Sequence, residues 1–545
     1  MSRIASALAD NPDHYDHFRS MLLTQRFLPA GRVQAAVGAA RATTPYNCFV
    51  SGVIEDDSSS IMERAKEAYF TMRVGGGIGY DFSTLRPRGD RIKSLDSSAS
   101  GPVSFMGIYD AVCATVSSAG HRRGAQMGVL RIDHPDIEEF IDAKRNSTSL
   151  TNFNISVGVT DAFMEALKND EDFPLSFDGR TYKYVRARFL WDKLMRATWD
   201  WAEPGVLFLD TINRKNNLYY CETITATNPC AEQPLAPYAA CLLGSFNLTK
   251  YVEPRLKTFD EDLFGIDIRA AVRAMDNIID PALYPLPEQR EAAINKRRMG
   301  LGLTGVANAI EALGYPYASP MFMETLERVL KVLRDEAYMA SVELAREKGP
   351  FPLFDRDKYC SGQFIKTLPR HIQEDIYYFG IRNSHLLSIA PTGTISLTAD
   401  NVSSGIEPVF SYGYDRTINL TRGIVIERVD DYGVRVFGTR GRTANEVSVA
   451  EHVSVLCLAS RYVDSACSKT CNVGDGVTWE EFKNVYLDAY YGGASGCTTF
   501  RAAGLRYGVL NAVTDTDGDG GDEEAGFDEG GACFFDPATG ARSCE

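Results

Sequence analysis

Asn228-Pro229-Cys230-Ala231-Glu232 is the stretch around which the rest of this sequence is organised. A thiol stands here between an amide and a carboxylate, each two residues away. In an extended segment, residues at i and i+2 point to the same side, so we expect the three side chains to face one small volume. Pro229 has a fixed φ and no backbone donor, which favours a rigid loop over a central strand. Taken alone, the same five residues also suit a turn with a buried cysteine, which often packs as a small apolar residue.

Composition excludes several classes of protein. The chain has 545 residues, of which 44% are hydrophobic, enough for one large α/β unit or for several domains. Its net charge of −15 argues against a broad basic surface for nucleic acid, although a local pocket can still bind a small anion. No apolar run approaches the roughly 18 residues of a membrane span, and the N-terminus lacks the apolar stretch of a signal peptide. We therefore expect a cytoplasmic protein whose twelve cysteines are reduced, metal-bound or catalytic.

Helical and strand patterns alternate along the chain, which predicts an α/β fold. The expected helices include 13–26, 58–73, 102–116, 136–144, 266–280, 451–467 and 478–490, and the expected strands include 46–50, 129–132, 152–157, 386–390 and 497–501. Thr478 and Glu481 form a capping-box pattern. Residues 170–190 look polar and irregular, whereas 412–450 look like an antiparallel insertion.

Several glycine-rich or basic loops are candidates for binding phosphates. The run Gly75 to Gly79 permits close backbone approach, and suits a structural turn as well as a ligand loop. The loops 85–91 and 117–128 are rich in arginine, whose forked donors suit phosphate. Pro391 to Ser396 follows a buried strand with a hydroxyl-rich glycine turn, a good phosphate cradle that lacks the lysine of a P-loop.

The last 35 residues differ in composition from the rest. Residues 511–531 carry eight acidic residues, no basic residue and six glycines, which predicts a flexible linker. Cys533 and Cys544 follow it. Two thiols on a mobile tail suit either a dithiol that moves between sites or half of a metal site. The dithiol is favoured because zinc requires about four ligands. We expect no metal-ion site.

Six segments, in this order, resemble those of ribonucleotide reductases. They are Tyr46-Asn47-Cys48-Phe49-Val50, the glycine run 75–79, Gly120 to Leu130, Asn228 to Glu232, Cys241 to Leu248, and Ala390 to Ser396. The resemblance covers about residue 20 to residue 510 and the cysteine tail, and it outweighs the interpretation of the central stretch as a simple turn. Within the family, the chain looks like the class II enzymes, which depend on adenosylcobalamin.

The resemblance implies a ten-stranded α/β barrel of two five-stranded halves, with a central finger loop that carries Cys230. It implies that homolysis of adenosylcobalamin yields a 5′-deoxyadenosyl radical that takes hydrogen from Cys230, whose thiyl radical then removes the 3′-hydrogen of the ribose. Glu232 matches the general base at the 3′-hydroxyl, and Asn228 matches the residue that hydrogen-bonds the sugar hydroxyls. Cys48 and Cys241 match the pair that reduces the 2′ position and ends as a disulfide.

The resemblance also implies binding sites for substrate and effector. The substrate-binding residues would be Asn47, Gly76, Gly77, Pro391, Thr392, Gly393, Thr394, Ile395 and Ser396. Loops 84–91 and 117–125 match the loops that bind a dNTP or ATP effector, with the side chains of Arg86, His121, Arg122 and Arg123. The family's effector site lies at a dimer interface, so a homodimer is implied.

The tail pair Cys533 and Cys544 resembles the shuttle that a thioredoxin- or glutaredoxin-like protein re-reduces, although ten residues separate the two thiols where a CxxC-type spacing is commoner. The expected organisation is a short lead-in at 1–25, a barrel domain at 26–510, a linker at 511–531 and the redox tail at 532–545. The lead-in has no room for the family's ATP-cone, so we expect specificity control without an overall on/off site.

Two alternatives remain open within this reading. A class I large subunit would carry a tyrosine pair on the strand at 497–501, and this segment has none; the pair Tyr490-Tyr491 lies earlier, at a helix end. A catalytically silent nucleotide-binding regulator would have lost one of the thiols or the carboxylate. No glycyl-radical segment and no separate cobalamin-binding motif of a mutase is present. Diphosphate substrates are favoured over triphosphates by the resemblance alone.

Overall fold

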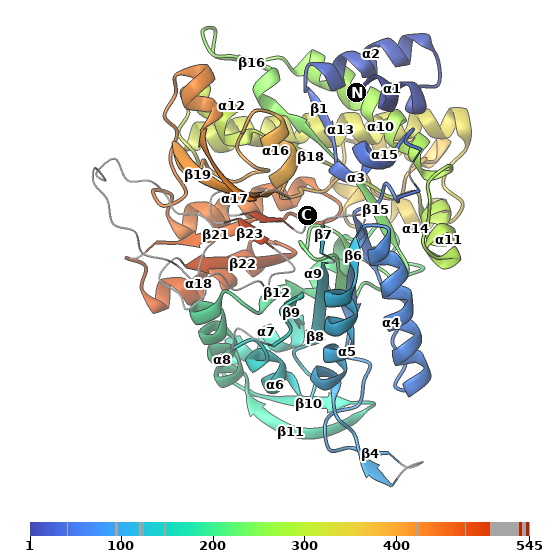
Figure 1. Cartoon of the computed structure of the whole chain (residues 1–545), viewed down its shortest axis with the longest axis vertical. Helices are drawn as coiled ribbons and strands as arrows, with labels where there is room; N and C mark the ends of the chain where they lie inside the picture. Colours follow the sequence, from blue (N-terminus) through green and yellow to red (C-terminus); the bar gives the residue numbers. More distant parts are fainter. Residues whose placement is uncertain are drawn as a thin grey trace.

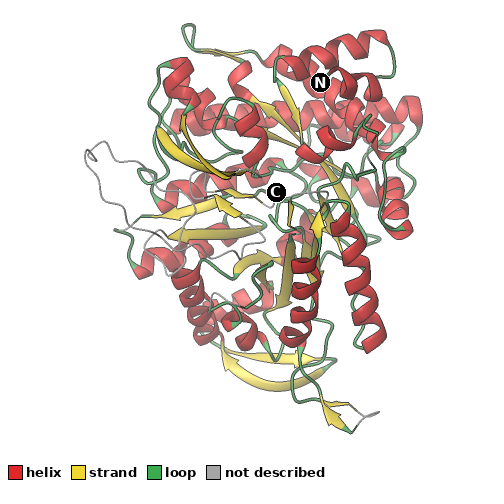
Figure 2. Ribbon diagram, viewed as in Figure 1, coloured by secondary structure: helices red, strands yellow, loops and turns green. Residues whose placement is uncertain are grey.

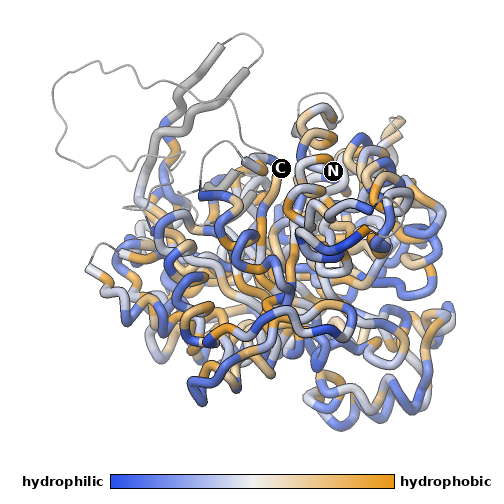
Figure 3. Tube along the Cα trace, turned by 90° about the horizontal axis from the view of Figure 1, so that it is seen from below, coloured by the Kyte–Doolittle hydropathy of each residue, from blue (hydrophilic) through white to orange (hydrophobic). Residues whose placement is uncertain are grey.

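The computed structural model describes residues 1–501, apart from 41, 93–95, 119–121, 124, 146–148, 421–422 and 475, together with two short strands, β23 (Phe534–Asp536) and β24 (Ala541–Ser543). A large sheet runs through the middle of this mixed α/β structure, and most helices lie around its outside (Figures 1 and 2). In Figure 3 the hydrophobic segments gather toward the interior and the hydrophilic ones toward the outer turns. None of the helices in the described ranges combines the length and apolar character needed to cross a membrane.

One part of the sheet is a run of five strands that are parallel to one another. Its order is β2 (Cys48–Val50), β3 (Gly77–Asp81), β8 (Gln126–Arg131), β9 (Phe153–Val159) and β12 (Gly205–Phe208). Every residue of β9 and of β12 is buried. Both faces of this run are therefore covered, as is usual for parallel sheets.

The other part of the sheet contains two parallel pairs. They are β15 (Ala240–Asn247) with β18 (Met299–Thr304), and β21 (Thr470–Val473) with β22 (Gly496–Arg501). This part meets the first run at two antiparallel junctions, β2 with β15 and β12 with β22. β1 (Phe27–Pro29) adds an antiparallel edge to β15. Between the two pairs, single parallel bridges join Leu301 to Leu387 and Ile389 to Cys467. The expected strand at 386–390 is thus present only as bridges.

Long helices cover the sheet, and one of them begins at the capping pair that the sequence predicts. The main ones are α2 (Pro12–Leu23), α4 (Ser58–Arg73), α5 (Pro102–Thr115), α8 (Ala187–Trp201), α10 (Glu261–Ile279), α13 (Pro320–Lys348), α17 (Val449–Tyr462) and α18 (Trp479–Tyr491). The capping box of Thr478 and Glu481 at the start of α18 is confirmed. The side chain of Asp57 accepts from two backbone N–H groups at the start of α4, which satisfies donors that a helix leaves unpaired.

The expectation of an irregular segment at 170–190 is wrong. The chain forms a hairpin there, β10 (Asp172–Phe177) and β11 (Arg180–Arg186), on the outside of the molecule. Most of β11 is exposed, so its residues needed no apolar alternation, and cross-strand pairing stabilises it instead. The antiparallel insertion expected at 412–450 is confirmed as β19 (Gly413–Leu420) and β20 (Gly423–Asp430).

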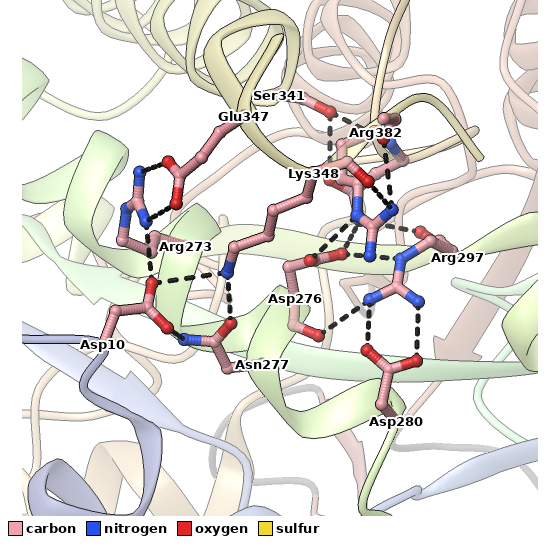
Figure 4. Close-up of polar contacts among 12 residues, drawn as sticks. Asp10, Arg273, Asp276, Asn277, Asp280, Arg297, Ser341, Glu347, Lys348 and Arg382 are labelled. Atoms are coloured by element: carbon pink, nitrogen blue, oxygen red, sulfur yellow. Dashed lines mark hydrogen bonds and ion pairs between the residues drawn. The ribbon is translucent and has the colours of Figure 1, made fainter. Parts of the chain in front are cut away.

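A buried ion network fixes the chain where it enters β18 (Figure 4). Asp276 on α10 accepts from Arg297 Nε at 2.9 Å, from Arg382 Nε at 3.2 Å and from Asn383 Nδ2 at 2.8 Å. Arg297 also donates twice to Asp280, at 3.0 Å each. Loss of one partner would leave an uncompensated buried charge, which is costly. The network therefore holds together α10, the start of β18 and the segment that leads to residues 386–390.

Candidate active site

The central stretch forms the tip of a small hairpin made by β13 (Ala226–Thr227) and β14 (Pro234–Leu235). Asn228 N donates to Gln233 O at 3.2 Å, and Ala231 N donates to Asn228 O at 3.0 Å. Ala231 has φ +65°, in the left-handed region. The loop that Pro229 favours is present, but a tight turn, and not the i, i+2 alternation of an extended segment, brings Asn228 and Glu232 to the same side.

Glycines of β3 provide the space in which this hairpin lies. A Cβ on Gly79 would overlap the carbonyl oxygen of Thr227, and a Cβ on Gly77 would lie 3.1 Å from Pro229 Cγ. A Cβ on Gly76 would meet the ring of Phe49 at 2.6 Å. Part of the glycine run thus serves the close approach of the chain's own loop.

Cys48 on β2 lies against both polar side chains of the loop. Asn228 Nδ2 donates to Cys48 Sγ at 3.2 Å, and the Cys48 thiol donates to Glu232 Oε1 at 3.7 Å. Asn228 Oδ1 accepts from Gln233 N at 2.9 Å, which orients the amide. Three residues from two distant parts of the sequence therefore form one buried polar group.

Burial controls the protonation of this group. It raises the pKa of Glu232 to about 7, although hydrogen bonding from Asn228 acts in the opposite direction. It also raises the pKa of Cys48 and of Cys241 well above the ordinary thiol value, with the Glu232 carboxylate adding to the rise at Cys48. At neutral pH both thiols are protonated, whereas Glu232 is close to its midpoint and can take up or release a proton.

Cys241 on β15 pairs directly with Cys48 on β2 in the antiparallel register. Residues opposite each other in such a ladder have Cα atoms about 4.5–5.5 Å apart, within the range that a disulfide spans. Both thiols are buried, with 2% and 0% exposure, whereas Cys230 at the loop tip is partly exposed. The arrangement supplies a buried dithiol beside a carboxylate and a more accessible third thiol.

The segment 391–396 forms a turn that enters the short helix α16 (Gly393–Thr398). Thr392 has φ +58°, and its hydroxyl bonds Thr304 Oγ1 at 2.9 Å and accepts from Gly405 N at 2.7 Å. Within the described residues, Thr394 Oγ1 and Asn47 Oδ1 are buried without a hydrogen-bond partner, as is Glu232 Oε2. Polar atoms of this kind suit a polar ligand.

The structure describes all of the predicted effector loop 84–91 but only part of loop 117–125. Arg86 binds Asp56 through Nε at 2.6 Å and through its backbone N–H at 3.1 Å. Arg122 and Arg123 form β7, which pairs with β6 (Ser117–Ser118). His121 lies outside the described residues, and so do Cys533, Cys544 and the linker 511–531.

The strand near the C-terminal end of the sheet, β22, carries Cys497-Thr498-Thr499-Phe500 and no tyrosine. Tyr490 and Tyr491 end α18, where the Tyr490 hydroxyl donates to Asp161 at 2.9 Å and Tyr491 is 65% exposed. Their place at a helix end is as expected from the sequence.

Two loop contacts were not anticipated. Asn154 Nδ2 on β9 donates to Pro229 O at 3.0 Å, and Ser388 Oγ donates to Glu232 O at 2.9 Å. Neither residue belongs to a sequence motif that predicts such a role, because each contacts a loop that is far away in sequence.

Comparison with known proteins shows the family of the chain. A family model described as "Ribonucleotide reductase, barrel domain" matches residues 46–432. A vitamin B12-dependent ribonucleoside-diphosphate reductase from Mycobacterium tuberculosis is 36% identical, over 94% of this chain and 77% of that protein. One of the same name from Thermoplasma acidophilum is 36% identical over 86% of this chain and 62% of its own length. A ribonucleoside-diphosphate reductase subunit alpha from Chlamydia pneumoniae is 27% identical over 72% of this chain and 43% of its own length. The chain belongs to the ribonucleotide reductase family.

Proposed function

We propose that this chain is a class II, adenosylcobalamin-dependent ribonucleotide reductase that converts ribonucleoside diphosphates to 2′-deoxyribonucleotides. One observation carries the proposal: a half-buried thiol, Cys230, lies on a loop whose Asn228 and Glu232 contact the buried thiol of Cys48. The two relatives that are 36% identical bear the name of vitamin B12-dependent diphosphate reductases, which supports both the cofactor and the substrate class.

The residues have complementary roles in the proposed reaction. A Cys230 thiyl radical takes the 3′-hydrogen of the ribose, while Glu232 accepts the 3′-hydroxyl proton and Asn228 hydrogen-bonds the sugar hydroxyls. Loss of the 2′-hydroxyl as water uses a thiol proton, and Cys48 and Cys241 supply the two electrons and become a disulfide. At the end the Cys230 thiol returns the hydrogen to the C3′ radical, which completes the product and regenerates the thiyl radical. A Glu232 pKa of about 7 suits a base that works near neutral pH.

The exposure of the thiols fits a bulky radical-generating cofactor. Cys230 is partly exposed, whereas Cys48 and Cys241 are buried, so of these three residues Cys230 is the one that a large group could reach. When bound, adenosylcobalamin supplies the one-electron chemistry that removes hydrogen from the Cys230 thiol. The chain's own part is to hold that thiol in place and to shield the other two.

We further propose that the sheet closes into a ten-stranded barrel, with the 228–233 hairpin as its central finger loop. The five parallel strands β2 to β12 would form one half. β15, β18, residues 386–390, β21 and β22 would form the other, and the bridges from Leu301 to Leu387 and from Ile389 to Cys467 support this. Contacts of the loop with β2, β3 and β9, and with residues 388 and 466, support its central position.

Substrate and effector sites complete the proposal. Unpartnered polar atoms of Asn47 and Thr394 support a substrate cradle, which would comprise Asn47, Gly76, Gly77 and Pro391 to Ser396. A dNTP or ATP effector would bind Arg86, His121, Arg122 and Arg123 in a homodimer. The tail thiols Cys533 and Cys544, after the linker 511–531, would re-reduce the Cys48–Cys241 disulfide at the expense of a thioredoxin- or glutaredoxin-like protein. The barrel domain would span 26–510, after the lead-in at 1–25.

The test is anaerobic incubation of the full chain with adenosylcobalamin, a ribonucleoside diphosphate, a dNTP effector and dithiothreitol. We expect deoxyribonucleotide without any partner subunit, and none from Cys230→Ala. Product that appears only after addition of a metal-containing subunit would assign the chain to class I. A protein that binds nucleotide but forms no product under either condition would be a silent regulator.

A further inference from the structure

We propose that Asn154 and Ser388 are positioning residues that fix the radical-cysteine loop from its two sides. The inference rests on the function proposed above. Both side chains are buried, with 3% and 0% exposure, and each donates to a backbone carbonyl of the loop. The two carbonyls belong to Pro229 and Glu232, so they bracket the two residues between them, Cys230 and Ala231.

The Ser388 side of this clamp fixes the backbone of the general base. The Ser388 hydroxyl donates to Glu232 O at 2.9 Å, and Ala466 N donates to the same oxygen at 3.1 Å. A Cβ on Gly300 would lie 3.0 Å from Ser388 Cβ, so β18 runs close to this residue. The Ser388 hydroxyl is therefore held firmly by its surroundings.

The Asn154 side holds the residue just before the thiol. Asn154 lies on β9, in the run of five parallel strands, and its Nδ2 donates to Pro229 O at 3.0 Å. Ser388 lies in the segment bridged to β18 and toward β21, in the other part of the sheet. The loop is thus held between elements that are far apart along the chain, and its position follows how those elements are assembled.

The loop needs such external contacts because it holds itself weakly. β13 and β14 contain two residues each, and a short two-stranded hairpin is at best marginally stable in water. Ala231 at the tip has φ +65°, a conformation that L-residues rarely adopt and that persists only where surrounding structure enforces it. Two charge-neutral donors on fixed elements supply that enforcement without altering the charge beside Glu232.

Hydrogen transfer by a thiyl radical depends steeply on where the sulfur lies. A misplacement of about 1 Å can lower a rate by roughly 100-fold. Removal of either donor should therefore reduce kcat, while KM changes little, because neither residue belongs to the proposed substrate cradle.

The experiment compares Ser388→Ala and Asn154→Asp with Thr198→Val. Asn154→Asp keeps the shape of the side chain and removes the amide donor. Thr198 is a matched control on α8, since its buried hydroxyl also donates to carbonyls, those of Leu194 at 3.0 Å and Pro204 at 2.9 Å, away from the loop. If Asn154→Asp does not fold, Ser388→Ala carries the test alone.

The first readout requires neither cofactor nor nucleotide. The full-length variants are alkylated with iodoacetamide, and peptide mass spectrometry gives the rate at Cys230 relative to that at the exposed Cys221. We expect this ratio to rise several-fold in the two loop variants and to stay unchanged in Thr198→Val, because a released loop exposes its thiol. The second readout is kcat with adenosylcobalamin, expected to fall roughly 10- to 100-fold.

An alkylation ratio in Ser388→Ala equal to that of Thr198→Val would overturn the proposal, whatever happens to kcat, because the loop would then not have moved. If the parent protein shows no reductase activity, the proposed function fails, and the alkylation ratio still decides whether the two residues position the loop.

Discussion

The thiol of Cys48 donates to the carboxylate of Glu232 across 3.7 Å, although the two residues are 184 positions apart in the chain. The contact joins the first strand of the parallel run to the hairpin tip, and both groups are buried. Burial raises the pKa of both groups, and the Glu232 carboxylate adds to the rise at Cys48, whereas the hydrogen bond from the Cys48 thiol lowers the pKa of Glu232. The protonation of one residue therefore bears on the chemistry of both.

Glu232→Gln should stabilise the protein at high pH. The folded-state pKa of about 7 lies above the ordinary value of 4.5, so the carboxyl's contribution to stability is complete below pH 4.5 and is lost as the pH rises through 7. Above pH 7 the parent carries a buried carboxylate, which the glutamine variant lacks. The free energy of unfolding of the variant should therefore gain on the order of 3 kcal/mol relative to the parent between low and high pH. Urea unfolding of both proteins at pH 5 and pH 8 measures this. An equal difference in the free energy of unfolding at both pH values would contradict it.

The same residue should set the pH dependence of turnover. Only the ionised carboxylate can accept the 3′-hydroxyl proton, so kcat of the parent should rise with pH through about 7. Glu232→Gln should lower kcat roughly 10²- to 10⁴-fold and lose this rise. Rates from pH 5.5 to 8.5 at saturating substrate test it; a variant that kept the parent's profile would assign the titration to another group.

Reduced protein given substrate and cofactor without reductant should form one Cys48–Cys241 disulfide for each product molecule. The two residues are opposite each other in the ladder between β2 and β15, which favours their pairing. Another pair, Cys471 and Cys497, has sulfur atoms 3.9 Å apart and could oxidise as well. The experiment therefore combines Cys471→Ser with Cys533→Ser as background, which removes this pair and also the tail dithiol that would re-reduce the disulfide, and reads the linkage by peptide mass spectrometry. Product without the Cys48–Cys241 linkage would refute their role as reductant.

Gly79→Ala should displace the radical-cysteine loop. Its Cβ would overlap the carbonyl oxygen of Thr227, so the hairpin must shift, at a cost of about 1–3 kcal/mol in the free energy of unfolding and most of the activity. Gly107→Ala is the matched control, because Gly107 lies within α5 with open space around it. That variant should gain roughly 0.5–1 kcal/mol and keep full activity. Denaturant unfolding and turnover of both variants measure this difference. Equal stability and equal activity of Gly79→Ala and Gly107→Ala would show that the loop does not lie against β3.

Cys533→Ser should separate the two kinds of reductant. A small dithiol can reach the Cys48–Cys241 disulfide by itself, so turnover with dithiothreitol should stay near that of the parent. Turnover with thioredoxin should be lost if electrons pass through the tail. Exposed Cys221, changed to serine, provides a control that should affect neither. Equal behaviour of Cys533→Ser and the parent with both reductants would remove the tail from the electron path.

Much of the local structure could be predicted from neighbouring residues. Asp57 and the pair Thr478 and Glu481 mark the starts of two helices, because a cap is a contact within one turn of the chain. The expectation of an irregular segment at 170–190 was wrong for a related reason. β11 is stabilised by its partner strand, and an exposed strand carries no strong apolar alternation to reveal it.

By itself, the sequence determined which chemical groups this protein has: the amide, thiol and carboxylate of 228–232, two further thiols and the glycines that leave room for a loop. Tertiary structure alone decided how they meet. The left-handed turn at Ala231, the pairing of Cys48 with Cys241, and the donors from Asn154 and Ser388 all depend on which strands are neighbours in the sheet. Propensities act over a few residues, whereas these contacts join residues 75 to 193 positions apart, and only the packed sheet brings them within hydrogen-bond distance.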